Sequence, residues 1–146
     1  MIANRSVPTN IILPHILYQS VSEALAWLTR VFGFAEHYRY GVQDGEISGA
    51  QLHLGNAYIM LENARGRQTP AQLGFGTQYV TIFVDTIDAH FAKSKAEGAK
   101  IVEDLHETIY GERQYVAEDL EGHRWLFSQH ARDVNPADWG ATVAKP

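Results

Sequence analysis

The sequence predicts an α+β fold in which two tandem β-α-β-β-β modules form a curved mixed-sheet cup around a small-molecule pocket. Two observations lead to this prediction. Segments with the apolar patterns of strands and helices follow one another in the same order twice along the chain. A glycine ends each predicted helix, Gly33 in the first half and Gly98 in the second. Since one half alone would leave a face of its sheet unburied, the repeated order favours two modules that fold together.

The first module is predicted over about residues 10–63. Its opening strand is apolar except for His15, as in a buried strand, and Pro14 places part of it near an edge or a bulge. The helix that follows has apolar residues at helical spacing, and Ser20 or Ser22 can cap it. The predicted elements are a strand over 11–18, a helix over 24–32 and strands over about 34–41, 47–54 and 57–62.

A polar, glycine-rich linker over about 64–77 precedes the second module, which is predicted over about 78–130. Asp85 is placed to cap the helix of this module. The tail, residues 131–146, is expected to pack on the surface, so that residues 1–146 form a single domain. The predicted elements are a strand over 79–84, a helix over 87–97 and strands near 100–105, 113–118 and 124–128.

Side chains alternate between the two faces of a strand, so their parity sorts them into two sets. The uniformly apolar set is expected to pack under the helices and comprises Ile12, Pro14, Ile16, Tyr18, Leu52, Leu54, Ala57, Ile59, Leu61, Val80, Ile82, Val84, Trp125 and Phe127. The other set mixes apolar, aromatic and polar side chains, which a ligand cavity needs. This predicted pocket lining comprises Leu13, His15, Leu17, Gln51, His53, Tyr58, Met60, Glu62, Tyr79, Thr81, Phe83, Arg124, Leu126 and Ser128.

The composition argues against several classes of function. The chain has a formal net charge of -5 and scattered basic residues, which argues against nucleic acid as a partner. It has no cysteine, which excludes disulfides, thiolate nucleophiles and Cys-ligated metal sites. The first residues lack the apolar stretch of a signal peptide, and no segment is apolar for long enough to span a membrane. We therefore expect a cytoplasmic protein with no membrane partner.

A family likeness is carried by three segments, AWLTRVFGF, VDTIDAHFAKSKAEGAKIV and YGERQYVAEDLEGHRWLF. Together with the duplicated order, they resemble the vicinal oxygen chelate superfamily, which includes glyoxalase, bleomycin-resistance proteins and extradiol dioxygenases. The resemblance covers roughly residues 10–130 and is greatest to uncharacterised glyoxalase-like and bleomycin-resistance-like members. Their D-P-x-G-H-x-W turn corresponds to residues 119–125, with Leu120 in place of Pro. The resemblance implies a glyoxalase/bleomycin-resistance-like fold and a homodimer.

Metal-dependent members of the superfamily hold one divalent ion with four inward-facing ligands, and the resemblance places these at Leu13, Met60, Tyr79 and Leu126. Leucine and methionine side chains are not ligands for a hard divalent cation, and tyrosine binds one only as a phenolate. No cofactor is therefore predicted. The alternative is one divalent metal ion held by His15, His53 and Glu62.

Two polar residues of the predicted lining are candidates for proton transfer. His15 can act as a general base or a ligand-binding donor, and Glu62 can act as a base if an apolar setting raises its pKa. The structural alternatives are a half-buried histidine and a solvated carboxylate. Tyr110, Arg113 and Arg124 are candidates for a polar rim, although Arg113 can instead pair with a neighbouring glutamate. The residues predicted to bind a ligand are His53, Tyr58, Met60, Tyr79, Thr81, Phe83, Tyr110, Arg113, Arg124 and Leu126.

Three functions remain open at this point. The first is metal-independent binding or sequestration of a small molecule, as in bleomycin-resistance proteins. The second is a divalent-metal-dependent lyase, isomerase or dioxygenase that uses His15 and Glu62. The third is a protein-interaction module without a ligand. The lost ligand positions and the aromatic lining favour the first.

Overall fold

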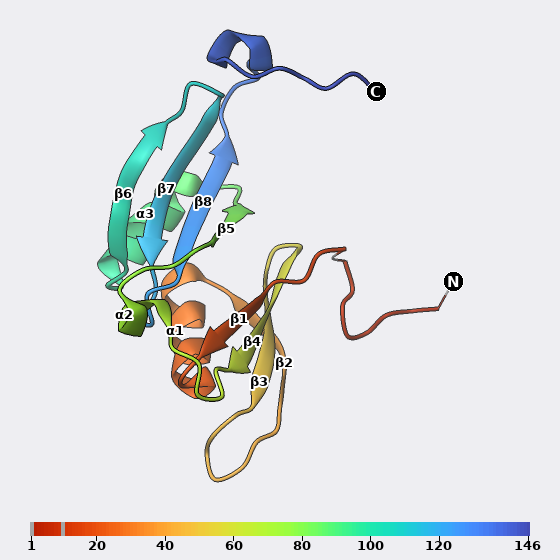
Figure 1. Ribbon diagram of the computed structural model, residues 1–146, viewed down its shortest axis with the longest axis vertical. Coiled ribbons are helices and arrows are strands. Elements are labelled where there is room, and N and C mark those ends of the chain that lie inside the picture. Colours follow the sequence, from red (N-terminus) through yellow and green to blue (C-terminus); the bar gives the residue numbers. More distant parts are fainter. Residues whose placement is uncertain (1, 10) are drawn as a thin grey trace. The chain divides into compact units, whose positions relative to one another are not determined.

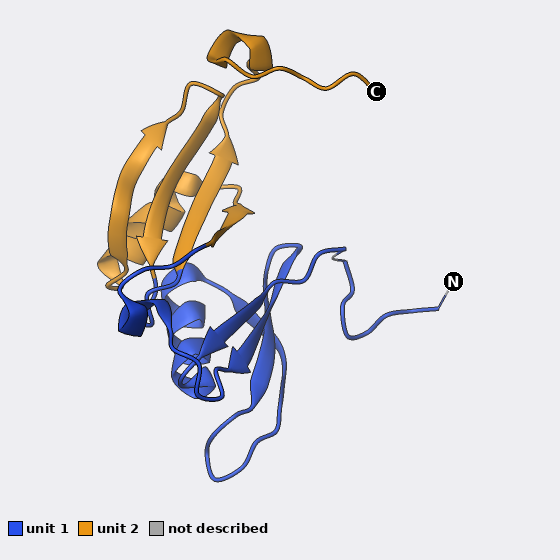
Figure 2. Cartoon of the chain, in the orientation of Figure 1, with its two compact units in different colours: residues 1–77, 119–123 blue, residues 78–118, 124–146 orange. Residues whose placement is uncertain are grey.

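The computed structural model describes residues 2–9 and 11–146 (Figure 1). Met1 and Asn10, where the first module is expected to begin, lie outside the described residues. The chain divides into two compact units (Figure 2). The first contains the residues up to 77 together with 119–123, and the second contains 78–118 and 124–146.

The first unit is built on a four-stranded mixed sheet with the strand order β1-β4-β3-β2. β1 pairs with β4 in parallel, and the other neighbours are antiparallel. The helix α1 connects β1 to β2, and a short helix α2 follows β4. The elements are β1 (His15–Tyr18), α1 (Val21–Phe32), β2 (Ala35–Tyr40), β3 (Gly49–Leu54), β4 (Ala57–Asn63) and α2 (Pro70–Leu73).

The second unit repeats this topology with the strand order β5-β8-β7-β6, in which β5 and β8 are the parallel pair. Its elements are β5 (Tyr79–Phe83), α3 (Ile87–Ala96), β6 (Lys100–Glu107), β7 (Glu112–Glu118), β8 (Arg124–His130) and a 3-10 turn, η1 (Pro136–Trp139). The predicted α+β fold, with the β-α-β-β-β order occurring twice, is confirmed. No helix among the described residues is long and apolar enough to cross a bilayer.

Eight of the fourteen side chains that strand parity assigns to the apolar face are buried in the core. In the first unit, Leu52, Ile59 and Leu61 are buried on the sheet, together with the buried residues of α1. In the second unit, Trp125 and Phe127 are buried, and Phe127 packs against His90 of α3. Burial of these side chains supplies the main driving force for each unit.

The first predicted strand is too long, and Ile12 is wrongly assigned to the buried face. β1 begins at His15, and the side chains of Ile11 and Ile12 are exposed. The carbonyl of Pro14 still accepts a hydrogen bond from the Met60 amide at 2.8 Å. Pro14 has no amide hydrogen to donate, so the regular ladder starts only after it.

The start of each helix tests a predicted cap. Ser20, one of the two predicted caps of α1, is confirmed, since it accepts a hydrogen bond from the Glu23 amide at 3.3 Å. Asp85 is wrongly predicted as the cap of α3, because Thr86 occupies the cap position. The Ile87 amide at the start of α3 instead donates to the side chain of Gln129, a partner 42 positions away. Within the predicted linker, Pro70 occupies the first turn of α2, where its missing amide hydrogen costs nothing.

The turn of residues 119–123 joins β7 to β8 and belongs to the first unit. The buried Tyr18 hydroxyl donates to Asp119 Oδ2 at 2.6 Å, and the second carboxylate oxygen of Asp119 accepts from the amides of Glu121 and His123. The Glu121 carboxylate accepts from the Gln19 and Ser20 amides, which precede α1. The turn therefore supplies hydrogen-bond partners for the end of β1 and the start of α1.

Tyr18 makes stability depend on pH in the alkaline range. Burial and the neighbouring Asp119 carboxylate raise the pKa of the Tyr18 phenol well above 10.0, and burial raises that of Tyr115. Above pH 10 the unfolded chain loses a proton that each folded phenol keeps. The free energy of unfolding should therefore fall as pH rises, by up to about 1.4 kcal/mol per pH unit for each phenol.

Urea unfolding between pH 9 and 12 checks this expectation. Tyr18→Phe should reduce the slope by the contribution of one phenol, and adding Tyr115→Phe should reduce it again. An unchanged slope in both variants would contradict the assignment.

Gly122 is required by both backbone angle and space. Its φ is +86°, and a Cβ placed on it would lie 2.7 Å from the backbone nitrogen of Ala71. Gly122→Ala should lower the free energy of unfolding by about 2–4 kcal/mol, from left-handed strain and overpacking combined. The matched control is Gly45→Ala, at φ +81° with no atom within 4 Å, which should cost only the strain of about 1–2 kcal/mol. Equal losses in the two variants, measured by denaturant unfolding, would show that the contact with Ala71 is unimportant.

Candidate functional site

Polar and aromatic side chains gather on the face of the first sheet opposite its apolar core. We call this the polar face. The residue pairs Gly49–Glu62, Gln51–Met60 and His53–Tyr58 lie directly opposite each other on β3 and β4, and therefore form three successive rows. β1 adds His15 opposite Met60, and β2 adds Tyr38 opposite Gln51 and Tyr40 opposite Gly49. The polar face is defined by His15, Leu17, His37, Tyr38, Tyr40, Gly49, Gln51, His53, Tyr58, Met60 and Glu62.

A β-bulge in β2 brings an additional side chain to the polar face. The register with β3 shifts between Glu36 and Tyr38. Tyr38 and the preceding His37 therefore both contact residues of this face, although neighbours on a regular strand point to opposite sides. His37 is absent from the lining predicted from the sequence, because strict alternation does not anticipate a bulge.

Gln51 lies at the centre of the polar face, and its side chain is fully buried. Its Oε1 accepts a hydrogen bond from His37 Nδ1, and its Nε2 lies 3.4 Å from the sulfur of Met60. The Tyr38 hydroxyl lies 3.8 Å from the same sulfur. Burial of an amide is costly unless its polar atoms are paired, so these contacts fix the orientation of Gln51. These contacts hold the centre of the polar face in one arrangement. The side chain of Met60 forms a rigid apolar floor there.

Three rings form an aromatic cluster at one end of the polar face. The rings of His53 and Tyr58 stack with centroids 5.1 Å apart and planes inclined by 20°. The ring of His37 meets Tyr58 edge to face, with centroids 5.8 Å apart. His53 and Tyr58 remain partly exposed. This cluster is suited to hold a planar group by stacking.

His15, in the middle row, pairs with Glu62 in the row at the other end of the polar face. His15 Nδ1 lies 2.6 Å from Glu62 Oε1, and the two side chains are 50% and 38% exposed. A carboxylate only accepts hydrogen bonds, so Nδ1 carries the hydrogen and donates it. The structure thus brings together the two residues predicted for proton transfer. His53 lies instead in the aromatic cluster, with its Nδ1 3.1 Å from the Gly55 carbonyl oxygen.

Tyr40 lies beside this pair. A Cβ placed on Gly49 would lie 2.2 Å from the Tyr40 ring, which shows that the ring crosses directly over this glycine. Burial and the negative charge of Glu62 raise the pKa of the Tyr40 phenol, and these effects exceed the opposing one of the Arg65 guanidinium. Like any tyrosine at neutral pH, Tyr40 is protonated and can donate a hydrogen bond. Tyr38 and Tyr40 share one strand parity, a signal in the sequence that the predicted lining did not use.

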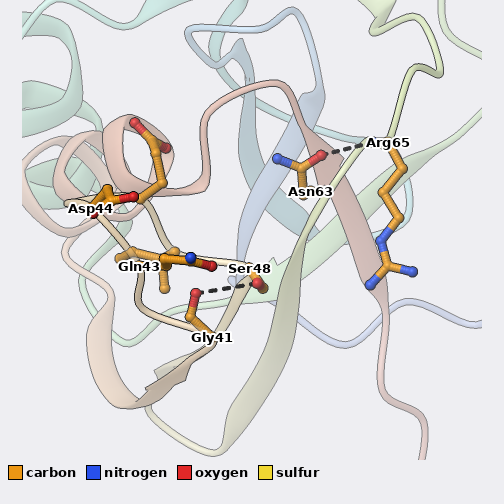
Figure 3. Close-up of a pocket in the computed structure, with 8 residues that line it drawn as sticks. Gly41, Gln43, Asp44, Ser48, Asn63 and Arg65 are labelled. Carbon is orange, nitrogen blue, oxygen red and sulfur yellow. Dashed lines mark hydrogen bonds between the residues drawn. The ribbon is translucent and has the colours of Figure 1, made fainter.

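A hollow of about 440 Å³ lies at the end of the first sheet, between the β2–β3 loop and the chain that leaves β4 (Figure 3). Asp44 and Arg65 in its wall both have positive φ angles, 52° and 50°, which are uncommon for residues other than glycine. The Ser48 hydroxyl donates to the Gly41 carbonyl, and Asn63 Oδ1 accepts from the Arg65 amide. The hollow is lined by Gly41, Gln43, Asp44, Glu46, Ile47, Ser48, Asn63 and Arg65. All of these residues except Gly41 and Ile47 have polar or charged side chains.

The remaining predicted ligand-binding residues belong to the second unit. Tyr79 and Phe83 of the edge strand β5 are 61% and 62% exposed, and Thr81 between them is also exposed. Leu126 is opposite Thr81 on β8 and half-buried. Arg124 pairs with Glu118 at 3.3 Å. The two exposed rings on β5 thus lie on the strand next to the ion pair of Arg124.

Tyr110 and Arg113 have structural partners in the second unit. The Arg113 guanidinium makes two hydrogen bonds to Asp88 of α3, at 2.8 and 3.2 Å, instead of pairing with a glutamate of its own strand. This contact lowers the pKa of Asp88. The ring of Tyr110 packs against Trp139, with centroids 5.5 Å apart. Both residues belong to the second unit and are not part of the polar face, which lies on the first.

The side chains at the positions of the family's metal ligands do not fit the metal site of the superfamily. Among residues 2–9 and 11–146, no three His, Asp or Glu side chains gather closely enough to hold a metal ion. Of the positions that correspond to the family ligands, Met60 is buried with its sulfur against Gln51 and Tyr38, and Leu13 offers only carbon. A thioether and aliphatic side chains do not replace the carboxylate and imidazole ligands of such an ion.

Several known proteins are similar to this chain in sequence or in fold. TioX from Micromonospora sp. ML1 is 35% identical in a match covering 83% of this chain and 98% of that chain, with a TM-score of 0.70. A glyoxalase/bleomycin resistance protein/dioxygenase family enzyme from Burkholderia phytofirmans PsJN is 21% identical, covering 81% and 96% of the two chains with a TM-score of 0.60. An uncharacterised protein of Mycobacterium tuberculosis H37Rv is 28% identical over 128 residues, which is 84% of this chain and 75% of the relative.

The family model for the Glyoxalase/Bleomycin resistance protein/Dioxygenase superfamily matches residues 12–127. This match covers both repeats of the β-α-β-β-β order and the turn between β7 and β8. The chain therefore belongs to the glyoxalase/bleomycin resistance protein/dioxygenase superfamily.

Proposed function

We propose that the protein binds a small planar molecule non-covalently and without a metal ion, on the polar face of its first sheet. The observation that carries this proposal is the aromatic cluster of His37, His53 and Tyr58 beside the buried Gln51–Met60 pair. Partly exposed rings next to a rigid apolar floor, with polar groups at fixed positions, are the composition of a ligand-binding surface.

The contacts of Gln51 support binding over a purely structural role for this face. A fully buried amide paired with a histidine and a thioether costs more to desolvate than an apolar residue of similar size. A sheet face that served only as a core would be more stable with apolar side chains. The amide instead holds the His37 ring against Tyr58, which keeps the aromatic cluster in one arrangement.

Independence from metal is supported by the donor set. Leu13 and Met60 occupy the two family ligand positions of the first unit and do not provide the oxygen or nitrogen atoms that a hard divalent cation needs. A resistance protein that sequesters its ligand by stacking and hydrogen bonding needs no such ion. The lyase, isomerase and dioxygenase chemistries that depend on the metal are therefore disfavoured for this chain.

Isothermal titration against a panel of planar heteroaromatic compounds, including a bleomycin-type glycopeptide, tests the proposal. Tyr58→Ala should weaken the binding of any compound that titrates by roughly three- to tenfold, as expected from an aromatic pair worth about 0.5–1.5 kcal/mol. Affinity should be the same after treatment with EDTA as after addition of Ni²⁺, Zn²⁺, Mn²⁺ or Fe²⁺.

The matched control is Tyr110→Ala, which removes a tyrosine ring of the second unit that packs on Trp139. This variant should bind with wild-type affinity. Equal weakening by Tyr58→Ala and Tyr110→Ala, or binding only in the presence of a metal, would contradict the proposal.

A further inference from the structure

We propose that the polar face also performs metal-free proton transfer, with His15 as the general base, Glu62 as its positioning residue and a planar carbon acid as the substrate. The inference rests on the proposed function, because the same aromatic cluster holds the substrate. It goes further in assigning a reaction and a chemical class: a ring that carries an acidic C–H bond.

The His15–Glu62 pair fixes which nitrogen can accept a proton. His15 Nδ1 donates to Glu62 Oε1 at 2.6 Å, so in the neutral ring the lone pair is on Nε2. The side chain is 50% exposed, which leaves room for a substrate to approach. A carboxylate that holds the imidazole in one tautomer and stabilises the imidazolium formed is the arrangement that activates histidine bases in other enzymes.

Strand register places this base next to the aromatic cluster. His15 is the partner of Met60 in the parallel ladder, and Tyr58 precedes Met60 by two residues on the same face of β4. Residues two apart on a strand are separated by about 7 Å. This is roughly the length of a fused bicyclic ring system. A planar molecule stacked on Tyr58 therefore reaches the row of His15 across the apolar side chain of Met60.

Tyr40 provides a group that favours developing negative charge. Its ring crosses over Gly49, which is the partner of Glu62 on the adjacent strand. A phenol is protonated at neutral pH, and burial and the Glu62 carboxylate raise the pKa of Tyr40 further. A protonated phenol on the row of Glu62 is suited to stabilise an anion formed on the substrate.

The reaction needs no co-reactant. His15 Nε2 takes the proton of a C–H bond, and the bonding electron pair passes into the substrate ring. In the probe 5-nitrobenzisoxazole, the C3–H bond breaks, its electrons form a nitrile, and the ring N–O bond breaks to leave a phenolate oxygen. The imidazolium then releases its proton to water. Atoms and charge balance without an oxidant, a reductant or a metal ion.

The experiment follows the release of 2-cyano-4-nitrophenolate from 5-nitrobenzisoxazole by its visible absorbance, in buffer with EDTA. Wild-type protein should show saturable turnover. His15→Gln should lower kcat by at least a hundredfold, as expected for loss of a general base. Glu62→Gln should lower kcat about tenfold with KM unchanged, whereas Tyr58→Ala should act mainly by raising KM.

The second unit offers a matched control. His130 Nδ1 lies 2.9 Å from Glu112 Oε1, and the His130 side chain is 54% exposed, so this histidine is paired with a carboxylate and exposed to nearly the same extent as His15. His130→Gln should leave turnover unchanged. Equal losses from His130→Gln and His15→Gln would indicate unspecific catalysis by surface histidines and overturn the inference. Circular dichroism of each variant serves to check that it is folded.

The outcomes separate this inference from the proposed binding function. If the probe binds saturably and Tyr58→Ala weakens this binding, but turnover does not depend on His15, the proposed binding function stands and the role of His15 as a base is refuted. Absence of saturation together with no effect of Tyr58→Ala refutes the binding face and with it the base. A Glu62→Gln variant that changes only KM refutes the positioning role of Glu62.

Discussion

The parallel pairing of β1 with β4 is the constraint on which the rest of the first unit depends. β1 has only four residues, yet its register decides which side chains enter the core and which lie on the polar face. A shift of one residue would place His15 in the core and Ile16 on the polar face. The pairing also sets His15 beside Glu62 and directs Tyr18 to the opposite side, where its hydroxyl meets Asp119.

The duplicated topology has diverged in chemistry. In the first unit, the face opposite the core combines rings, a buried amide and the His15–Glu62 pair. The corresponding face of the second unit carries the exposed rings of Tyr79 and Phe83 together with a row of charges in which Glu118 pairs with both Lys100 and Arg124. Exposed ion pairs of this kind contribute little to stability and are not a scaffold for stacking. The two repeats thus share one topology but differ in the side chains that they carry on this face.

Much of this organisation could be predicted from the sequence, because it depends on local patterns. Helical spacing and period-two alternation are properties of short segments, and they were sufficient for the strand and helix order and for eight of the fourteen strand residues assigned to the core. The same alternation put His15 and Glu62 on one face. What it could not predict is where the pattern is interrupted: the bulge that brings His37 beside Gln51, and the start of β1 after Pro14.

Other features depend on partners that are distant in sequence. The amide of Ile87 is satisfied by Gln129, so no nearby capping residue was needed to begin α3. Likewise, Tyr40 crosses over Gly49 because one strand has a glycine opposite a tyrosine on its neighbour, which becomes visible only when the pairing is known. Tertiary contacts of this kind override local propensity and have no signature in a single segment.

The turn of residues 119–123 has a consequence for the order of folding during synthesis. The first unit is otherwise complete by residue 77, but the partners of Tyr18, Gln19 and Ser20 are more than a hundred positions later in the chain. A ribosome must therefore translate most of the second unit before the first can finish its hydrogen bonds. The two repeats therefore do not fold independently of each other. A fragment that ends at residue 77 would expose the Tyr18 phenol and leave the Gln19 and Ser20 amides without their carboxylate partner.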